Sequence, residues 1–379
     1  MSWIAIKMLT GDRAKYFGII FGVAFATLLM AQQISIFIGI MKRTGNQILD
    51  IRDAPIWVMD NQTRYIDEVP ALPDIDLQRV RGVSGVAWAV KLYKGQVRAR
   101  LPGGEFRNIV LLGIDDTSLV GAPTELIVGQ LSDLRQPDAV IVDKAGHEYL
   151  WPGEPYRLGR TIEINERRAV LVGVCRASSP FFSMPIMYTR YSLAGGFVAR
   201  ERNFMSFVLA QPASGLSADE VCARIREQTR LQALTREQFF WKTIRYFLGS
   251  TGIPVNFGIT ICLGFIVGVA IAGQTFYLFT IENLKQFGAL KAMGLTNGRI
   301  VGMITLQALL VGGVGYGIGI GLTAGFFEAT GHITHLAGLG LRWEVALGTA
   351  AAVLVIVLLA SLVSVRRVLI LEPAVVFRG

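Results

Sequence analysis

Side chains that could support catalysis are few in this chain of 379 residues and form no recognisable set. The sequence contains neither G-x-S-x-G nor H-E-x-x-H, the arrangements that mark a serine hydrolase and a zinc protease. His147 beside Glu148 is interpreted as a surface pair, and no third ligand accompanies His332 and His335. We therefore expect no catalytic residue, no metal site and no cofactor held by this chain.

The chain also lacks a loop that could bind ATP. A P-loop requires G-x-x-x-x-G-K-[ST], and the dipeptide Gly-Lys does not occur in the sequence. Any ATP hydrolysis linked to this protein would therefore take place in a separate subunit, which would bind the ATP and Mg²⁺.

Four long apolar runs dominate the sequence, in which 52% of the residues are hydrophobic. They cover 16–41, 246–281, 300–327 and 345–365, and none contains Asp, Glu, Lys or Arg. Each run has at least the ~20 residues that a membrane-spanning helix needs, and the first is too long for the apolar part of a signal peptide. The sequence predicts an α-helical membrane protein with four transmembrane helices.

The charges that make up the formal net charge of +9 are distributed as this topology predicts. With the amino terminus inside, the cytoplasmic segments carry nine basic and three acidic residues, a net of +6. These residues are Lys7, Arg13, Lys15, Lys285, Lys291, Arg299, Arg366, Arg367 and Arg378 against Asp12, Glu282 and Glu372. The bias is that of a membrane protein with both termini in the cytoplasm, and it argues against a nucleic-acid partner.

A mostly polar region of about 200 residues, 42–245, separates the first two runs. The pattern predicts strands at 55–59, 85–90, 95–101, 106–112, 139–142, 159–164, 169–174 and 205–210, and helices at 74–80 and 217–230. This is a mixed α+β domain outside the membrane. The aromatic and basic segment 231–245 is interpreted as an interfacial belt or a second stalk helix.

The short polar loop 282–299 joins the second and third runs. Three apolar residues recur there at helical spacing, namely Leu284, Phe287 and Leu290. They predict a helix over 282–293, which Gly294 is placed to end, while Thr296 is placed to cap the next helix. From these residues alone, the helix is either a connector resting on lipid headgroups or a docking helix for a partner.

The run K-Q-F-G-A-L-K-A-M-G within this loop resembles the signature of the FtsX/MacB-type ABC transporter permeases. Its L-K-A-M-G sequence is most similar to the DevC-like branch. The matching positions are Glu282, Lys285, Gly288, Leu290, Lys291, Ala292 and Gly294. Gln286 departs from the pattern, which usually has Glu there. The segment 158–174 resembles a run of the MacB-type periplasmic domain, and 371–378 resembles the carboxyl end of the same family.

The resemblance implies that the loop is the coupling helix that touches the ATPase subunit. The coupling residues implied are Glu282, Lys285, Gln286, Phe287, Gly288, Leu290, Lys291, Met293 and Gly294. Phe287 has the largest side chain among them, so we predict that it is the apolar anchor that enters a pocket of the ATPase.

The implied function is that of a permease subunit in the bacterial inner membrane, in an exporter or mechanotransmission complex. A separate ATPase, a second permease copy and, in some complexes, a periplasmic adaptor are the implied partners besides membrane lipid. The external domain would act on a lipid, lipoprotein, peptide or hydrophobic small molecule. The alternative is a membrane-anchored sensor or scaffold without transport activity.

The third run contains a glycine at every fourth position, and we interpret this stripe as a surface for tight helix packing within the chain rather than a dimer face. Its members are Gly313, Gly317, Gly321 and Gly325.

The expected domain organisation is an amphipathic elbow (1–15), transmembrane helix 1 (16–41), stalk and α+β domain (42–245), stalk end and transmembrane helix 2 (246–281), coupling loop (282–299), transmembrane helix 3 (300–327), a short external loop (328–344), transmembrane helix 4 (345–365) and a cytoplasmic tail (366–379).

Overall fold

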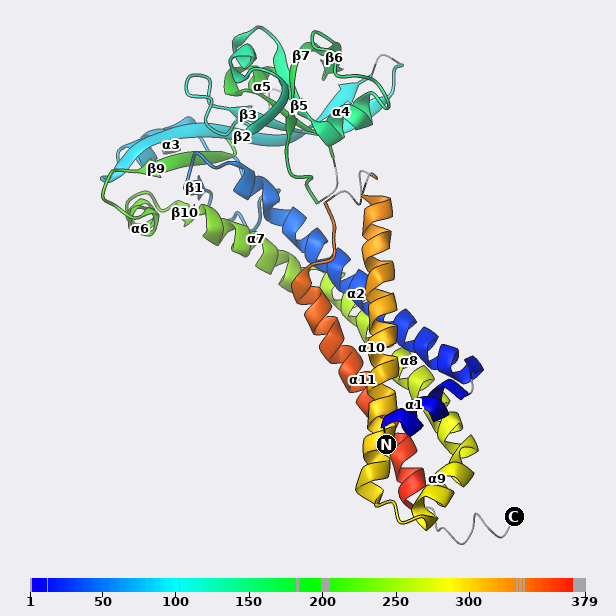
Figure 1. Ribbon diagram of the computed structural model, residues 1–379. Helices are drawn as coiled ribbons and strands as arrows, with labels where there is room; N and C mark the ends of the chain where they lie inside the picture. Colours follow the sequence, from blue (N-terminus) through cyan, green and yellow to red (C-terminus); the bar gives the residue numbers. More distant parts are fainter. Residues whose placement is uncertain are drawn as a thin grey trace. The chain divides into compact units, whose positions relative to one another are not determined.

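The computed structural model describes residues 2–11, 13–101, 103–181, 184–198, 205–331, 333, 336 and 338–370 (Figure 1). The chain divides into two compact units. We call Met1–Gly39 together with Gly252–Gly379 the helical unit, and Ile40–Thr251 the sheet unit. The carboxyl-terminal segment 371–379, like His332 and His335, lies outside the described residues.

The helical unit is built from α1 (Ser2–Gly11), the first part of α2 (Arg13–Asp50), α8 (Ile253–Glu282), α9 (Leu284–Ala292), α10 (Asn297–Thr330) and α11 (Trp343–Ile370). Four of the described helices, α2, α8, α10 and α11, are long and apolar enough to cross a membrane. α11 packs against both α8 and α10. The apolar runs of the sequence therefore form the expected four spans.

Close contact between spans depends on small residues of α10. A Cβ at Gly319 would lie 2.6 Å from the carbonyl oxygen of Ala24, and one at Gly315 would lie 2.8 Å from Cβ of Val23. Only glycine lets the backbones of α10 and α2 approach this closely. Gly312 makes the equivalent contact with Val357 of α11.

The predicted glycine stripe is not the packing surface within this chain. A Cβ at any of its four members, Gly313, Gly317, Gly321 and Gly325, would meet no atom within 4 Å. A four-residue spacing on a helix also leaves room for a second row of glycines, and that second row carries the contacts. The stripe faces outward from the described part of the helical unit, which corrects the interpretation made from the sequence.

Helix α1 lies against α10 at the predicted elbow. Gln307 of α10 is fully buried, and its Nε2 donates to the carbonyl oxygen of Ala5 at 2.7 Å. Ala5 and Leu9 are buried, whereas Trp3 is 67% exposed. This separation of faces is typical of an interfacial helix.

The sheet unit contains one ten-stranded mixed sheet. Its path is β10-β1-β9-β2-β3-β8-β5-β7-β4, and β6 pairs with β2 and β7. The strands are β1 (Ile56–Met59), β2 (Val86–Arg100), β3 (Phe106–Ile114), β4 (Glu125–Gly129), β5 (Ala139–Asp143), β6 (Thr161–Ile164), β7 (Arg167–Arg176), β8 (Ile186–Arg190), β9 (Phe207–Pro212) and β10 (Gln232–Thr235). The helices are α3 (Asp74–Arg81), the 3-10 helix η1 (Leu131–Arg135), α4 (Lys144–Leu150), α5 (Tyr191–Phe197), α6 (Ala218–Thr229) and α7 (Arg236–Ser250).

Strand β2 differs from the two separate strands that the sequence predicts. It is one continuous strand of 15 residues, and different strands pair with its first and second halves. Residues 86–92 pair with β9, and residues 93–100 pair with β3. Gly95 is needed inside the strand because the ring of Tyr93 lies over it, and a Cβ there would lie 2.3 Å from the Tyr93 hydroxyl.

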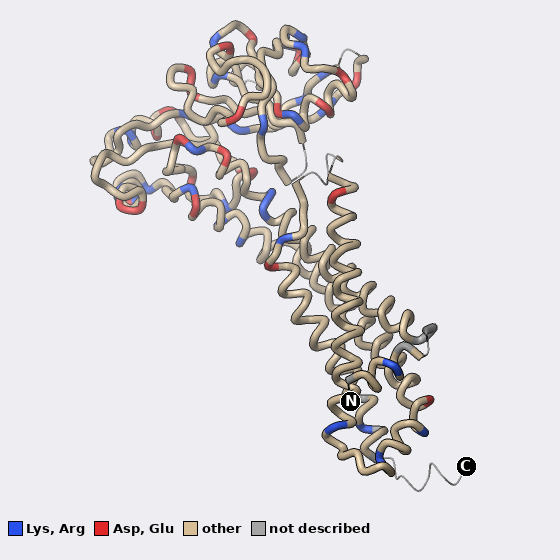
Figure 2. The backbone as a smooth tube through the Cα atoms, in the orientation of Figure 1, with Lys and Arg blue, Asp and Glu red and all other residues tan. Residues whose placement is uncertain are grey.

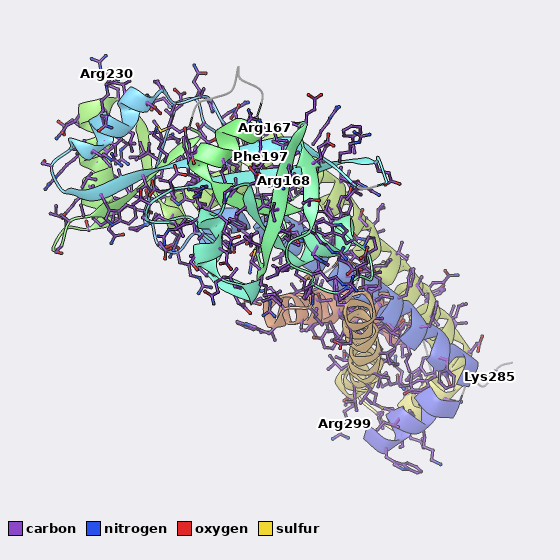
Figure 3. All side chains as sticks on the ribbon, turned by 90° about the horizontal axis from the view of Figure 1, so that it is seen from above. Arg167, Arg168, Phe197, Arg230, Lys285 and Arg299 are labelled. Atoms are coloured by element: carbon purple, nitrogen blue, oxygen red, sulfur yellow. The ribbon has the colours of Figure 1, made fainter. Side chains whose placement is uncertain are left out.

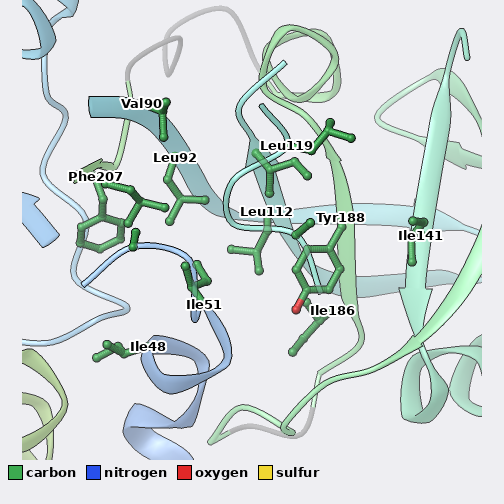
Figure 4. Close-up of a cluster of buried hydrophobic side chains, with 14 of the residues drawn as sticks. Ile48, Ile51, Val90, Leu92, Leu112, Leu119, Ile141, Ile186, Tyr188 and Phe207 are labelled. Carbon is green, nitrogen blue, oxygen red and sulfur yellow. The ribbon is translucent and has the colours of Figure 1, made fainter. Parts of the chain in front are cut away.

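The largest core of the sheet unit packs the last turn of α2 and α7 against the sheet. Ile48 of α2 and Ile51 just after it join Leu92 and Phe207 in this cluster (Figure 4). Asp50 fixes the helix end, since its carboxylate accepts from the backbone N and the Oγ of Ser178, both at 2.8 Å.

Several polar residues of the sheet unit are buried. His147, expected at the surface, is fully buried between the rings of Trp151 and Tyr156, because α4 turns it inward. Cys175 and Cys222 are free thiols in different cores, and burial raises the pKa of Cys222 to about 12.

Candidate coupling surface

The loop between α8 and α10 folds into a separate short helix, α9. Its start is set by Asn283, whose side-chain Nδ2 donates to the carbonyl oxygen of Phe279 at 2.8 Å. The backbone N of Asn283 donates to the same carbonyl at 3.2 Å, and α8 ends at Glu282. The helix predicted over 282–293 is therefore divided at Asn283 between α8 and α9.

The end of α9 agrees with the prediction made from Gly294. This residue has a φ of +91°, a conformation that glycine adopts without strain. The backbone N of Leu295 donates to the carbonyl oxygen of Leu290 at 3.1 Å, which closes the helix end. Thr296 occupies the N-cap position of α10, but its side chain makes no capping hydrogen bond.

The apolar flank of α9 faces the interior of the helical unit. Phe287 is 0% exposed and packs with Ile300 and Ile304 of α10 and Val368 of α11. Gly288 beside it is also buried. Phe287 is therefore unavailable as a surface anchor in this structure. The helical spacing indicates an apolar flank correctly, but it does not indicate what covers that flank.

Lys291 connects α9 to the end of α11. Its Nζ donates to the carbonyl oxygens of Val368 at 2.8 Å and Leu369 at 3.1 Å. These carbonyls belong to the last described turn of α11 (Trp343–Ile370). Lys291 therefore attaches the loop to the fourth span.

The exposed side of the loop carries a different group of residues. Met293 is 72% exposed, and Glu282, Lys285, Gln286 and Arg299 are exposed with it. We call these five residues the coupling surface. Figure 2 shows basic residues gathered at this end of the helical unit, whereas the long helices are almost free of charge. Figure 3 labels Lys285 and Arg299, which come from α9 and from the first turn of α10.

The composition of the coupling surface is suited to a protein partner. It contains two cations, one carboxylate and one amide, together with a single long apolar side chain, Met293. An unbranched thioether adapts to an irregular apolar pocket, and the cations can pair with acidic groups of a partner. Of the coupling residues predicted from the sequence, Glu282, Lys285, Gln286, Met293 and Gly294 are exposed. Arg299 was missing from that set because it follows the run K-Q-F-G-A-L-K-A-M-G and belongs to the next helix.

In the parts of the chain that the structure describes, no group of three or more His, Cys, Asp or Glu residues is placed to hold a metal ion.

Comparison with known families decides the class of protein. The family of FtsX-like permease C-terminal segments matches residues 258–373, and the MacB-like periplasmic core domain matches residues 16–228. The second match alone covers more than half of the chain. The chain belongs to the FtsX/MacB-type ABC transporter permeases. The first match includes α9 and the whole coupling surface, so this part of an FtsX-like permease is present here.

Curated relatives are also ABC transporter permeases. An uncharacterised ABC transporter permease of Mycobacterium tuberculosis H37Rv is 25% identical over 322 residues, which cover 83% of this chain and 81% of the relative. The corresponding protein of strain CDC 1551 matches equally. The family assignment made from the loop is therefore confirmed at the level of an ABC transporter permease.

Solved structures of external domains resemble part of the chain. The extracellular domain of the noncanonic ABC-type transporter YknZ from Gram-positive bacteria has 18% identity and a TM-score of 0.37, covering 48% of this chain and 98% of that one. The periplasmic region of MacB from Actinobacillus actinomycetemcomitans has 15% identity and a TM-score of 0.37, covering 54% and 98%.

Proposed function

We propose that this permease transmits the movement of a separate ATPase subunit to the sheet unit, in an exporter or mechanotransmission complex. The observation that supports the proposal is the coupling surface, which is exposed on a loop whose opposite flank is buried. Phe287 and Lys291 attach that loop to α10 and α11, so a force applied to Met293 would move the spans rather than bend the loop.

The proposed orientation places the coupling surface in the cytoplasm and the sheet unit outside the bacterial inner membrane. The basic residues at the loop end of the helical unit support it through the positive-inside bias. The sheet unit would then act on a lipid, lipoprotein, peptide or hydrophobic small molecule, with or without a periplasmic adaptor. Membrane lipid would surround the spans.

A second permease copy is part of the proposal. The outward-facing stripe Gly313, Gly317, Gly321 and Gly325 offers a smooth surface on α10. Small residues of this kind allow the backbones of two membrane helices to approach closely. We expect the second copy to use this stripe.

The test of ATPase coupling is substitution of Met293 in the full-length complex. Met293→Asp places a charge where the apolar anchor enters its pocket, and a central anchor can contribute about 2 kcal/mol or more. We expect capture of the ATPase by the tagged permease to fall at least about 30-fold in affinity, since 1.4 kcal/mol corresponds to tenfold. Met293→Leu is the matched control and should retain binding, because it keeps an apolar side chain of similar size.

A second variant separates binding from transmission. Lys291→Met removes the two hydrogen bonds to α11 but leaves the coupling surface unchanged. We expect the ATPase to bind normally while its stimulation by the permease falls. If no ATPase associates with the wild-type complex, or if Met293→Asp binds it as well as Met293→Leu does, the coupling role is wrong. A sensor or scaffold would then be the better description.

A further inference from the structure

A cavity of about 440 Å³ lies in the sheet unit, beside the middle of β2. It occurs where one edge of that strand changes partners. The backbone N of Ser206 donates to the carbonyl oxygen of Leu92, and β9 follows from there along residues 92–86. On the same edge, the backbone N of Asn165 donates to the carbonyl oxygen of Arg98, next to the start of the pairing with β6. In the described part of the chain, the edge of β2 between Leu92 and Arg98 pairs with neither β9 nor β6.

Lys94 supplies a buried charge to this cavity. Its side chain is 4% exposed, and its ammonium donates to the carboxylate of Asp67, which is itself 32% exposed. Burial lowers the pKa of Lys94, and the neighbouring Asp67 partly opposes that effect. Taking an ammonium out of water is costly, and a buried ion pair contributes little net stability in return. A purely structural role therefore explains the pair poorly.

The hydrogen-bonding capacity of the pair exceeds what its neighbours use. An ammonium has three protons to donate, and among the described residues the ammonium of Lys94 donates a hydrogen bond to Asp67 alone. A carboxylate accepts at several lone-pair positions, so Asp67 can accept a further donor. Gln96 adds a polar side chain to the wall, while Val69 and Val110 make part of it apolar. The hydroxyl of Ser206 is already used, since it accepts from the backbone N of Lys94 and donates to its carbonyl oxygen.

We infer that this cavity binds a small zwitterion of the α-amino acid class, with its carboxylate on Lys94 and its ammonium on Asp67. The lining charges sum to zero, so a ligand with one charge would leave one member of the pair without compensation. A zwitterion satisfies both, and the apolar wall accepts an aliphatic side chain. The volume is within the range of small-molecule sites. This inference is independent of the coupling role.

The experiment uses the full-length permease in detergent, titrated by calorimetry with three matched probes. L-leucine carries both charges, 4-methylpentanoate lacks the ammonium and 3-methylbutylamine lacks the carboxylate. We expect L-leucine to bind and each analogue to bind at least about tenfold more weakly, because each analogue lacks one of the two charged contacts.

Substitutions at Lys94 and Asp67 test the two proposed ligand contacts one at a time. Lys94→Met should fold, because Asp67 is partly exposed and can be hydrated, and it should weaken L-leucine binding at least about tenfold. Asp67→Asn should weaken L-leucine but strengthen 4-methylpentanoate, because the variant removes the carboxylate that this anion leaves uncompensated; it tests the site even if Lys94→Met does not fold. Lys91→Met is the control, since Lys91 lies on the same strand but pairs with Asp74 away from the cavity.

Two results would overturn the inference. One is the absence of L-leucine binding to the wild-type protein at concentrations up to about 10 mM, where a site of 1 mM affinity is largely occupied. The other is an L-leucine affinity that is the same in wild type, Lys94→Met and Asp67→Asn.

Discussion

At the scale of single residues, similar positions on the coupling loop have different roles because of burial. Phe287 and Met293 are both long apolar side chains of one short segment, yet the first is fully buried and the second is 72% exposed. The first should therefore contribute to stability and the second to recognition. The two roles can be separated by experiment.

Phe287→Ala should destabilise the helical unit by about 3 to 5 kcal/mol, the usual cost of removing a buried aromatic ring. The ring fills the space between α9, α10 and α11, and few side chains there can move into the cavity left behind. Thermal unfolding of the detergent-solubilised chain measures this loss. Met293→Ala, measured in parallel, should change stability by less than about 0.5 kcal/mol. Equal unfolding temperatures for both variants would contradict the assignment.

Asp143 predicts a pH effect on the sheet unit. Its carboxyl is fully buried and accepts from the backbone N of Ile186 at 2.8 Å and of Gly146 at 3.1 Å. Burial raises its pKa to about 7. Between pH ~4 and 7 the folded state therefore binds a proton that the unfolded state has lost, so stability falls as pH rises through this window.

The variant Asp143→Asn keeps an acceptor for both backbone groups and removes the titration. We expect it to unfold at nearly the wild-type temperature at pH 4 and at a higher temperature at pH 8. The gain is on the order of 4 kcal/mol if the full shift is realised. Asp143→Ala, which also loses the acceptor, should be less stable than Asp143→Asn at both pH values. A pH-independent difference between wild type and Asp143→Asn would show that the carboxyl does not titrate in this range.

At the scale of elements, the two glycine rows of α10 have different environments. Gly319 lies against Ala24 and Thr27 of α2, whereas Gly317 meets no atom of the described chain within 4 Å. A larger side chain at the first position must separate two helices, and one at the second position need not. The contrast gives a direct test of which row packs within the subunit.

Gly319→Leu should lower the yield of folded protein and its unfolding temperature, because overpacking a tight helix contact costs at least about 1 to 3 kcal/mol. Gly317→Leu should leave the folded subunit intact and reduce its association with a second copy. Thermal unfolding and light scattering of the purified chain measure the two effects. If Gly317→Leu proves the less stable of the pair, the rows have been assigned the wrong way round.

The sequence predicts some elements well and others poorly, for physical reasons. The four spans are predicted correctly because a run of ~20 or more residues without a charge is typical of a membrane-spanning helix. β4 and β8 are missed, because β4 is half-buried without clear alternation and β8 is too short and too buried to show a period of two. β10 is also missed, because it lies in the segment 231–245, which is interpreted from the sequence as an interfacial belt or a stalk helix and of which only the part from Arg236 is helical. The side of α9 that faces inward is not predictable from spacing alone, since lipid, an ATPase or α10 and α11 would each favour the same apolar flank. The Lys94 cavity depends on pairing between distant strands, which no local pattern contains.

At the scale of the whole molecule, the proposed function requires opposite locations for the coupling surface and the sheet unit. A periplasmically active reporter inserted at Gly153, an open position with a φ of +70°, should be active. The same reporter after Gly379 should be inactive, and a cytoplasmically active reporter should show the reverse. Cytoplasmic activity at Gly153 would contradict the topology, because the sheet unit would then lie on the ATPase side.

The pairing of β1 has a consequence for the order of events during biosynthesis. β1 follows soon after α2, but both of its neighbours come late in the sheet unit: Ile56 pairs with Ala210 of β9 and with Thr235 of β10. Until these later strands have been synthesised, the apolar strand Ile56–Met59 has no partner and resembles an unprotected sheet edge, which is prone to aggregation. Closing so long a loop is also slow. β1 can therefore pair only when the ribosome has nearly reached the second span, and a chain stalled before Phe207 would expose β1 to proteases and holding chaperones.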